Sequence, residues 1–87
     1  MNDLEILEAF EKKLKYVIDI YCIAVGKGYL ILDMYMKANC IVVCLVDEDN
    51  NTTSGTYVLQ DRNKYVSEDY VENVVLAFFN TLIKEKV

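Results

Sequence analysis

Histidine and proline are missing from this 87-residue sequence, and it has only three cysteines and three glycines. Without histidine, a serine or cysteine nucleophile lacks its usual base. The cysteines, Cys22, Cys40 and Cys44, lie in apolar runs without C-x-x-C spacing, which is typical of small core residues in a reducing compartment rather than of a zinc site. We therefore expect neither an activated nucleophile nor a metal or other cofactor.

Basic residues and long apolar runs are also scarce. Nine Lys and Arg face fourteen Asp and Glu, so the net charge is −5, and direct nucleic-acid binding, which needs a basic surface, is not expected. The apolar run at 16–25 contains Asp19 and ends at Gly26-Lys27-Gly28, too short to cross a bilayer. The N-terminal residues are acidic where a signal peptide is basic. The sequence predicts a cytoplasmic protein without a membrane segment.

The chain begins with a helical pattern. Asn2 or Asp3 can cap a helix. Its apolar stripe consists of Leu4, Leu7, Phe10 and Leu14. Residues 16–25 either continue this helix or, because they are dense in β-branched and aromatic residues, form a strand. The strand is favoured, because pairing it across Gly26-Lys27-Gly28 with residues 29–36 sorts apolar and polar side chains onto separate faces of a hairpin.

Three more elements complete the predicted fold. Residues 40–46 are apolar throughout and predict a strand covered on both sides. A polar loop then leads to a fourth strand at 56–60, and Ser67 is a good cap for a final amphipathic helix. The prediction is an α+β fold in one small domain, residues 1–87: a four-stranded antiparallel β-meander flanked by an N-terminal and a C-terminal helix (α-β-β-β-β-α).

The polar loop opens with Asp47-x-Asp49-x-Asn51, which is how a calcium loop begins. Such a loop needs glycine at its sixth position and glutamate at its twelfth, and those positions hold Thr52 and Val58. Strands rather than helices are predicted on either side. We interpret this stretch as a solvated loop between the third and fourth predicted strands.

Asp19 and Asp33 are candidates for an acid/base pair. In the predicted hairpin they lie diagonally on neighbouring strands, roughly 7–8 Å apart, a spacing that suits paired carboxylates. Tyr35 and Tyr21 lie opposite them, however, and hydrogen bonds from the two phenols would account for all four residues structurally. A small sheet face also offers no cleft. We predict that the protein is not an enzyme.

The second face of the predicted sheet is too apolar to be left in water. If both helices pack on the other side, it exposes Asp19, Tyr21, Ile23, Tyr29, Ile31, Asp33 and Tyr35, with Ile41, Val43 and Leu45 beside them. This composition is typical of a protein-binding patch, unless one helix crosses to this side and buries it. The predicted partner-binding residues are Asp19, Tyr21, Tyr29, Ile31, Asp33 and Tyr35, with Asp47, Glu48 and Asp49 steering a basic target.

The leading hypothesis is a small non-enzymatic protein that binds and occludes a partner protein of unknown identity, as an inhibitor or regulator. It is also expected to self-associate, as a homodimer or higher oligomer. Short acidic chains of this class are often encoded by phages or mobile elements and act on host or defence proteins, here in the host cytoplasm. One alternative is an acidic nucleic-acid mimic that uses the carboxylates at 47–49 and 68–72. Another is a small-ligand sensor with a pocket between sheet and helices.

Overall fold

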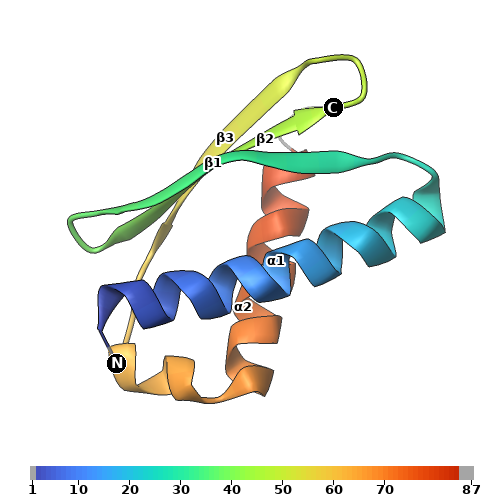
Figure 1. Ribbon diagram of the computed structural model, residues 1–87. Coiled ribbons are helices and arrows are strands. Elements are labelled where there is room, and N and C mark those ends of the chain that lie inside the picture. The colour runs from blue at the N-terminus through green and yellow to red at the C-terminus, as the bar shows by residue number, and fades with distance from the viewer. Residues whose placement is uncertain (1, 85–87) are drawn as a thin grey trace.

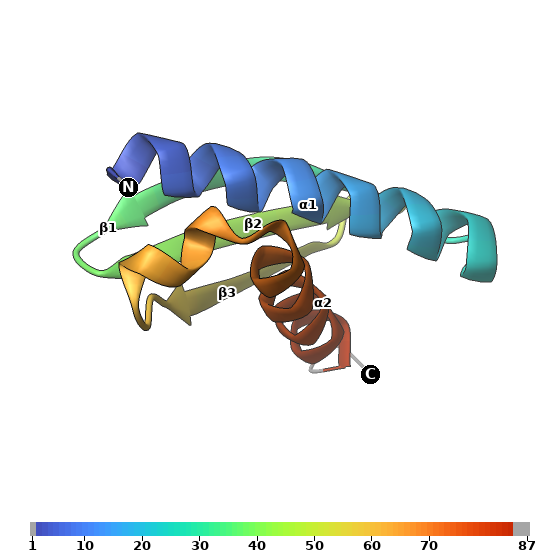
Figure 2. The ribbon, with the colours of Figure 1, turned by 90° about the horizontal axis from the view of Figure 1, so that it is seen from below.

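A computed structural model describes residues 2–84 of the chain. Its elements are helix α1 (Asp3–Val25), strands β1 (Tyr29–Lys37), β2 (Cys40–Asp47) and β3 (Thr52–Val58), the short 3-10 helix η1 (Arg62–Val66) and helix α2 (Glu68–Lys84). The strands form one antiparallel sheet in the order β1-β2-β3. Both helices lie on the same side of the sheet, so the α+β fold has two layers (Figure 1, Figure 2). Neither helix within residues 2–84 has the length and hydropathy that a bilayer crossing requires.

The prediction of four strands is wrong, because residues 16–25 continue the first helix. At the start of α1 the Asn2 side chain accepts the Glu5 N–H while the Glu5 carboxylate accepts the Asn2 N–H, which forms a capping box. At its end Gly26 is left-handed (φ 78°), a common way for a helix to stop. The β propensity of the segment is overridden because the buried stripe of α1 continues to Ile18.

One β-bulge interrupts the pairing of β1 with β2. Ile31 pairs with Leu45, but Asp33 pairs with the adjacent Cys44, so Leu32 is an extra residue in β1. Before the bulge the odd-numbered side chains of β1 point toward the helices, and after it the even-numbered ones do. The side chains of β1 that point away from the helices are therefore the even-numbered ones before the bulge and the odd-numbered ones after it.

The remaining connections are short. The polar stretch predicted as a loop does join β2 to β3, but β3 begins at Thr52, earlier than the predicted strand at 56–60. After β3, η1 is held against the start of α1 and the β1–β2 turn. Arg62 pairs with Asp3 and donates a hydrogen bond to the side-chain oxygen of Asn39, 3.0 Å away.

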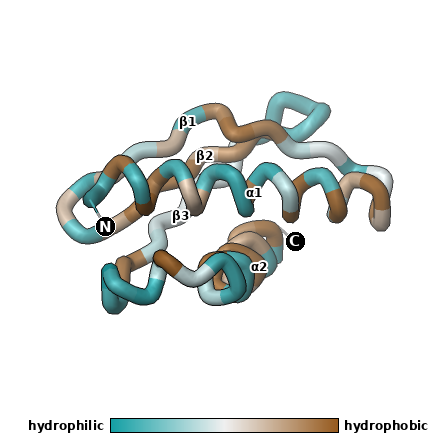
Figure 3. The backbone as a smooth tube through the Cα atoms, turned by 60° about the horizontal axis from the view of Figure 1, so that its bottom comes forward, coloured by the Kyte–Doolittle hydropathy of each residue, from teal (hydrophilic) through white to brown (hydrophobic). Residues whose placement is uncertain are grey.

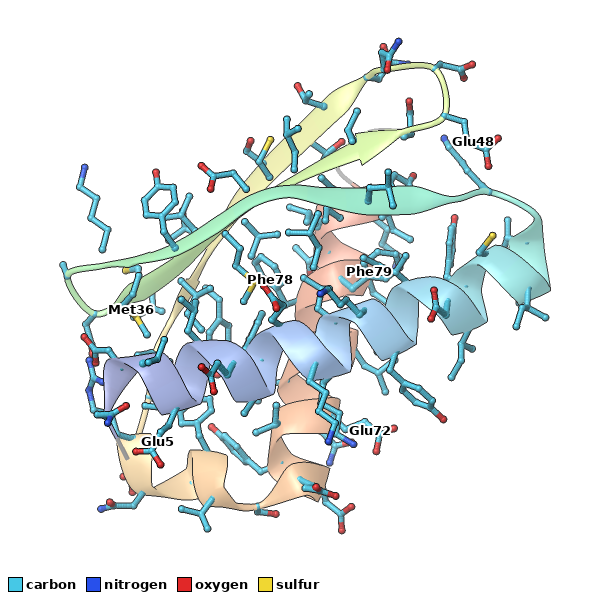
Figure 4. All side chains as sticks on the ribbon, in the orientation of Figure 1. Glu5, Met36, Glu48, Glu72, Phe78 and Phe79 are labelled. Carbon is cyan, nitrogen blue, oxygen red and sulfur yellow. The ribbon has the colours of Figure 1, made fainter. Side chains whose placement is uncertain are left out.

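The core lies between the sheet and the two helices. It includes Ile6, Phe10, Leu14, Val17 and Ile18 of α1, Ile41, Val43 and Leu45 of β2, and Val71, Val75, Phe79 and Leu82 of α2. Figure 4 shows Phe78 and Phe79 where α2, α1 and the sheet meet, and Met36 on the helix side of β1. The expectation that Ile41, Val43 and Leu45 face away from the helices is wrong: all three are fully buried, because both helices cover that side of the sheet.

Candidate protein-binding surface

The side of the sheet opposite the helices is covered by no element of residues 2–84 (Figure 1). We call this surface the open sheet face. It consists of Leu30, Leu32, Asp33, Tyr35 and Lys37 of β1, Cys40, Val42, Cys44 and Val46 of β2, and Thr52, Ser54, Thr56 and Val58 of β3. Each of these side chains is exposed or half-buried.

Apolar side chains dominate the part of the open sheet face that lies over β1 and β2. Leu30 is 73% exposed, Leu32 60% and Tyr35 42%. The outward residues of β2 are only Cys and Val, and all are half-buried. The outward residues of β3 carry hydroxyls except Val58, and Figure 3 shows β3 paler than the hydrophobic stretches of β1 and β2. The face is an apolar area with a polar strip along one side.

Two charged residues lie on this face, and both belong to β1. Asp33 and Lys37 are exposed, and the strand geometry places them about 13 Å apart with Tyr35 between them. Asp33 is held at the bulge, where its Oδ1 accepts the N–H of Met34 at 2.9 Å. Tyr35 shares one row across the sheet with Val42 and Thr56. Within the described chain the open sheet face therefore carries one acid and one base.

The predicted Tyr/Asp patch is divided between the two sides of the sheet. Asp33 and Tyr35 are on the open sheet face, but Tyr29 and Ile31 point toward the helices. Tyr29 is only 6% exposed, and its ring lies 5.9 Å from that of Tyr21. The bulge explains the division, because it reverses which positions of β1 face outwards between Ile31 and Asp33.

Asp19 and Tyr21 belong to α1 and therefore lie beneath the sheet. Asp19 is exposed and lines a hollow of about 390 Å³ between α1 and β1. Tyr21 is half-buried, with its ring 5.3 Å from that of Phe79. Because Asp33 lies on the opposite side of the sheet, the diagonal pairing of Asp19 with Asp33 across a hairpin does not occur.

The calcium-like opening of the polar loop has a structural role. Asp47 is 7% exposed, and its Oδ1 accepts the N–H groups of Asp49 and Asn51, both at 2.9 Å. The exposed Glu48 accepts the N–H of Gly28 at 2.9 Å, which fixes the loop against the end of α1. Glu48 and Asp49 are exposed at this end of the sheet, whereas Asp47 is turned inwards.

A basic residue adjoins this loop. The Nζ of Lys27 lies 4.0 Å from Oδ2 of Asp47 and 5.6 Å from the centre of the Tyr29 ring. The phenol of Tyr29 and, to a smaller extent, the carboxylate of Asp47 raise the pKa of Lys27 above its ordinary value. Among residues 2–84, no three or more Cys, Asp and Glu side chains cluster in a way that could hold a metal ion.

Sequence reasoning missed a second apolar surface, between the two helices. Tyr16, Ile20 and Ala24 of α1 and Leu76 of α2 line a groove of about 250 Å³, which we call the helix groove. Beyond it the C-terminal end of α1 projects past the sheet (Figure 2). Tyr16, Ile20 and Ala24 have the spacing of one helix face. The prediction of a strand at 16–25 leaves no helix surface there, so it does not indicate this groove.

Comparisons with protein-family models, with curated proteins and with solved structures give no match, so the arrangement of these residues is the basis for assigning a function.

Proposed function

We propose that this chain is a small non-enzymatic protein that binds another protein through the open sheet face, and that it inhibits or regulates that partner by occluding it. The observation that carries the proposal is the uncovered apolar area over β1 and β2. Leu30, Leu32 and Tyr35 are exposed side by side with half-buried Val and Cys residues of β2. Contiguous exposed apolar area of this kind is typical of protein-interaction surfaces.

The composition of the open sheet face also suits a protein partner. A tyrosine stands among aliphatic side chains, charged residues are few, and hydroxyls line one side, as in an interface with an apolar centre and a polar rim. Tyr35 is the side chain expected to contribute most, because tyrosine is enriched among the interface residues whose truncation costs the most binding energy. Leu30 is the most exposed large apolar side chain of the face. Glu48 and Asp49, near one end of the sheet, would steer approach to a basic target, with the net charge of −5.

The two alternative functions receive less support. The exposed carboxylates of the β2–β3 loop and those at the start of α2 lie at opposite ends of the molecule (Figure 1), so they do not form the continuous acidic strip that a nucleic-acid mimic needs. A ligand sensor would use the hollow between α1 and β1, which is lined by Lys15, Ile18, Asp19, Tyr29, Leu30 and Ile31. Specific ligand pockets bury most of the ligand around a few convergent polar groups, whereas the two polar side chains that line this hollow, Lys15 and Asp19, are both exposed to solvent.

The test is capture of partners with matched variants. The double variant Leu30→Ser/Tyr35→Ser removes two large side chains from the open sheet face, and Leu4→Ser removes one from an exposed position on α1. Circular dichroism and thermal unfolding first establish that both variants fold. In cross-linking from cells that express the protein, the same identified proteins should be recovered with the wild type and with Leu4→Ser, and lost with the double variant. Equal recovery with the double variant would contradict the proposal.

A further inference from the structure

The charges of the open sheet face are self-complementary. Its one acid, Asp33, and its one base, Lys37, lie on the same strand on either side of Tyr35. Consider a line that passes through Tyr35 and crosses the strands. Turning a copy of the face by 180° about this line exchanges the positions of the acid and the base. A second copy placed face to face in this way brings opposite charges together twice, with no like charges opposed.

From this we infer that a second copy of this chain occupies the open sheet face, packed face to face about a two-fold axis that runs along the row Tyr35–Val42–Thr56. The inference rests on the proposed function, since it uses the same surface, and it names a second copy of the chain as the occupant of that surface when no foreign partner is bound. The axis lies between the two sheets and crosses the strands, so β1 lies over β1 of the second copy with reversed direction. Such an interface is isologous, and its contacts occur in pairs.

The packing that follows from this axis is apolar at its centre. Tyr35 and Val42 meet their own counterparts, and the row of Asp33 and Cys44 lies over the row of Lys37 and Cys40 of the second copy. Two stacked sheets are about 10 Å apart, a gap that Val, Cys and Tyr side chains fill from both sides. The Asp33 carboxylate of each copy then pairs with the Lys37 ammonium of the other, so one ion pair lies on each side of Tyr35, along β1.

The extent of the face sets the expected strength of the dimer. The strands contain 9, 8 and 7 residues, and about half of them point outwards. About this axis the Tyr35 row and the rows on either side of it lie over each other, so each copy would bury about nine of these residues, compared with roughly 20–30 a side in a standard stable interface. The row of Leu30, Val46 and Thr52 extends beyond this overlap. A reversible dimer with a dissociation constant on the order of tens of micromolar is expected, because small interfaces belong to the weak class. Such a dimer can yield the face to a tighter foreign partner.

The experiment is a charge exchange measured by sedimentation equilibrium, from about 10 to about 500 µM so that the expected constant is bracketed. Asp33→Lys alone and Lys37→Asp alone each replace both ion pairs of the dimer by pairs of like charges. Each should raise the dissociation constant at least about tenfold. The double variant Asp33→Lys/Lys37→Asp restores both ion pairs, and its dissociation constant should be within about threefold of that of the wild type. An equimolar mixture of the two single variants should form a heterodimer of similar strength.

Three outcomes would overturn the inference. One is a wild type that stays monomeric over the whole range. Another is a dimer that both single variants leave unchanged, since it would then use a different surface, such as the helix groove. The third is failure of the double variant and of the mixture to associate although thermal unfolding shows all variants folded. None of these results decides the capture experiment with Leu30→Ser/Tyr35→Ser, so failure of the homodimer and failure of the proposed function are distinguishable.

Discussion

A methyl group of Leu82, in α2, occupies the space where the side chain of Gly55, in β3, would begin. The ring of Phe78 borders the same space, with its Cζ atom 3.5 Å from the position of a Cβ on Gly55. Gly55 lies on the helix side of β3, between Thr53 and Tyr57. The lack of a side chain at Gly55 therefore lets α2 pack directly onto the backbone of the edge strand.

Replacing Gly55 with valine should destabilise the fold. The added side chain overlaps Leu82 and presses on Phe78, and overpacking of this kind costs about 1–3 kcal/mol of unfolding free energy. The matched control is Ser54→Val, on the open sheet face of the same strand, where β propensity predicts no loss or a small gain. Chemical denaturation measures both. Equal stabilities for the two variants would contradict the close packing of α2 on β3.

Gly26 offers a test of the end of α1. Its φ of 78° is left-handed, and a Cβ there would meet no other atom within 4 Å, so only the backbone conformation opposes a side chain. Gly26→Ala should cost about 1 kcal/mol, whereas Gly26→Asn should cost less, because asparagine tolerates this conformation. Denaturation midpoints of the two variants provide the measurement. If alanine were accepted without loss, α1 would not end in this left-handed turn.

The continuation of α1 through residues 16–25 is where sequence reasoning failed most. The segment satisfies two patterns at once: its β-branched residues alternate well enough for a hairpin, and Leu14, Val17 and Ile18 also fall on one helix face. Local propensity favoured the strand, but burial of that helix face against the core decided the outcome. The capped start of α1, the presence of a strand at 40–46, the polar loop and the final helix were predictable because their signals are local. The expectation that the strand at 40–46 is covered on both sides is wrong, because its outward Val and Cys side chains are half-buried on the open sheet face.

The bulge at Leu32 could not be read from the sequence. Residues 29–35 contain no glycine or other marker of a bulge, and strict alternation from Tyr29 to Tyr35 places all the odd-numbered positions of β1 on one face. One inserted residue was enough to place Tyr29 among the core rings and leave Tyr35 in solvent. The prediction of an exposed sheet face thus named Asp33 and Tyr35 on that face, but none of the leucines beside them.

The hydroxyl groups of Tyr57 and Tyr65 lie 2.6 Å apart and join β3 to η1. Burial, as the largest cause, raises the pKa of both phenols above their ordinary value of about 10. Because the folded state favours the protonated phenols, their contribution to stability is complete below about pH 10 and is lost as the pH rises above that value. We therefore expect the free energy of unfolding to fall as the pH rises above about 10. Chemical denaturation curves recorded at a series of fixed pH values measure this fall.

Tyrosinate absorbance provides the independent check on this alkaline transition. Tyr57 and Tyr65 should ionise together with unfolding, so that part of the absorbance change of the seven tyrosines coincides with the loss of ellipticity. In Tyr57→Phe one ionising group is absent, and the stability should fall less steeply with pH, by up to about 1.4 kcal/mol per pH unit. An unchanged slope in this variant would show that Tyr57 does not contribute to the transition.

The buried carboxylate of Asp47 provides the last test, at the β2–β3 loop. Asp47→Ala leaves the N–H groups of Asp49 and Asn51 without their acceptor and should cost about 1–3 kcal/mol. Asp47→Asn keeps a side-chain oxygen for these groups and should cost less, while Asp49→Ala, at an exposed position of the same loop, should be nearly neutral. Thermal unfolding ranks the three variants. Because Asp47 turns inwards to organise the loop, adding calcium should not raise the melting temperature of the wild type, and a calcium-dependent increase that Asp47→Asn abolishes would reassign the loop as a metal site.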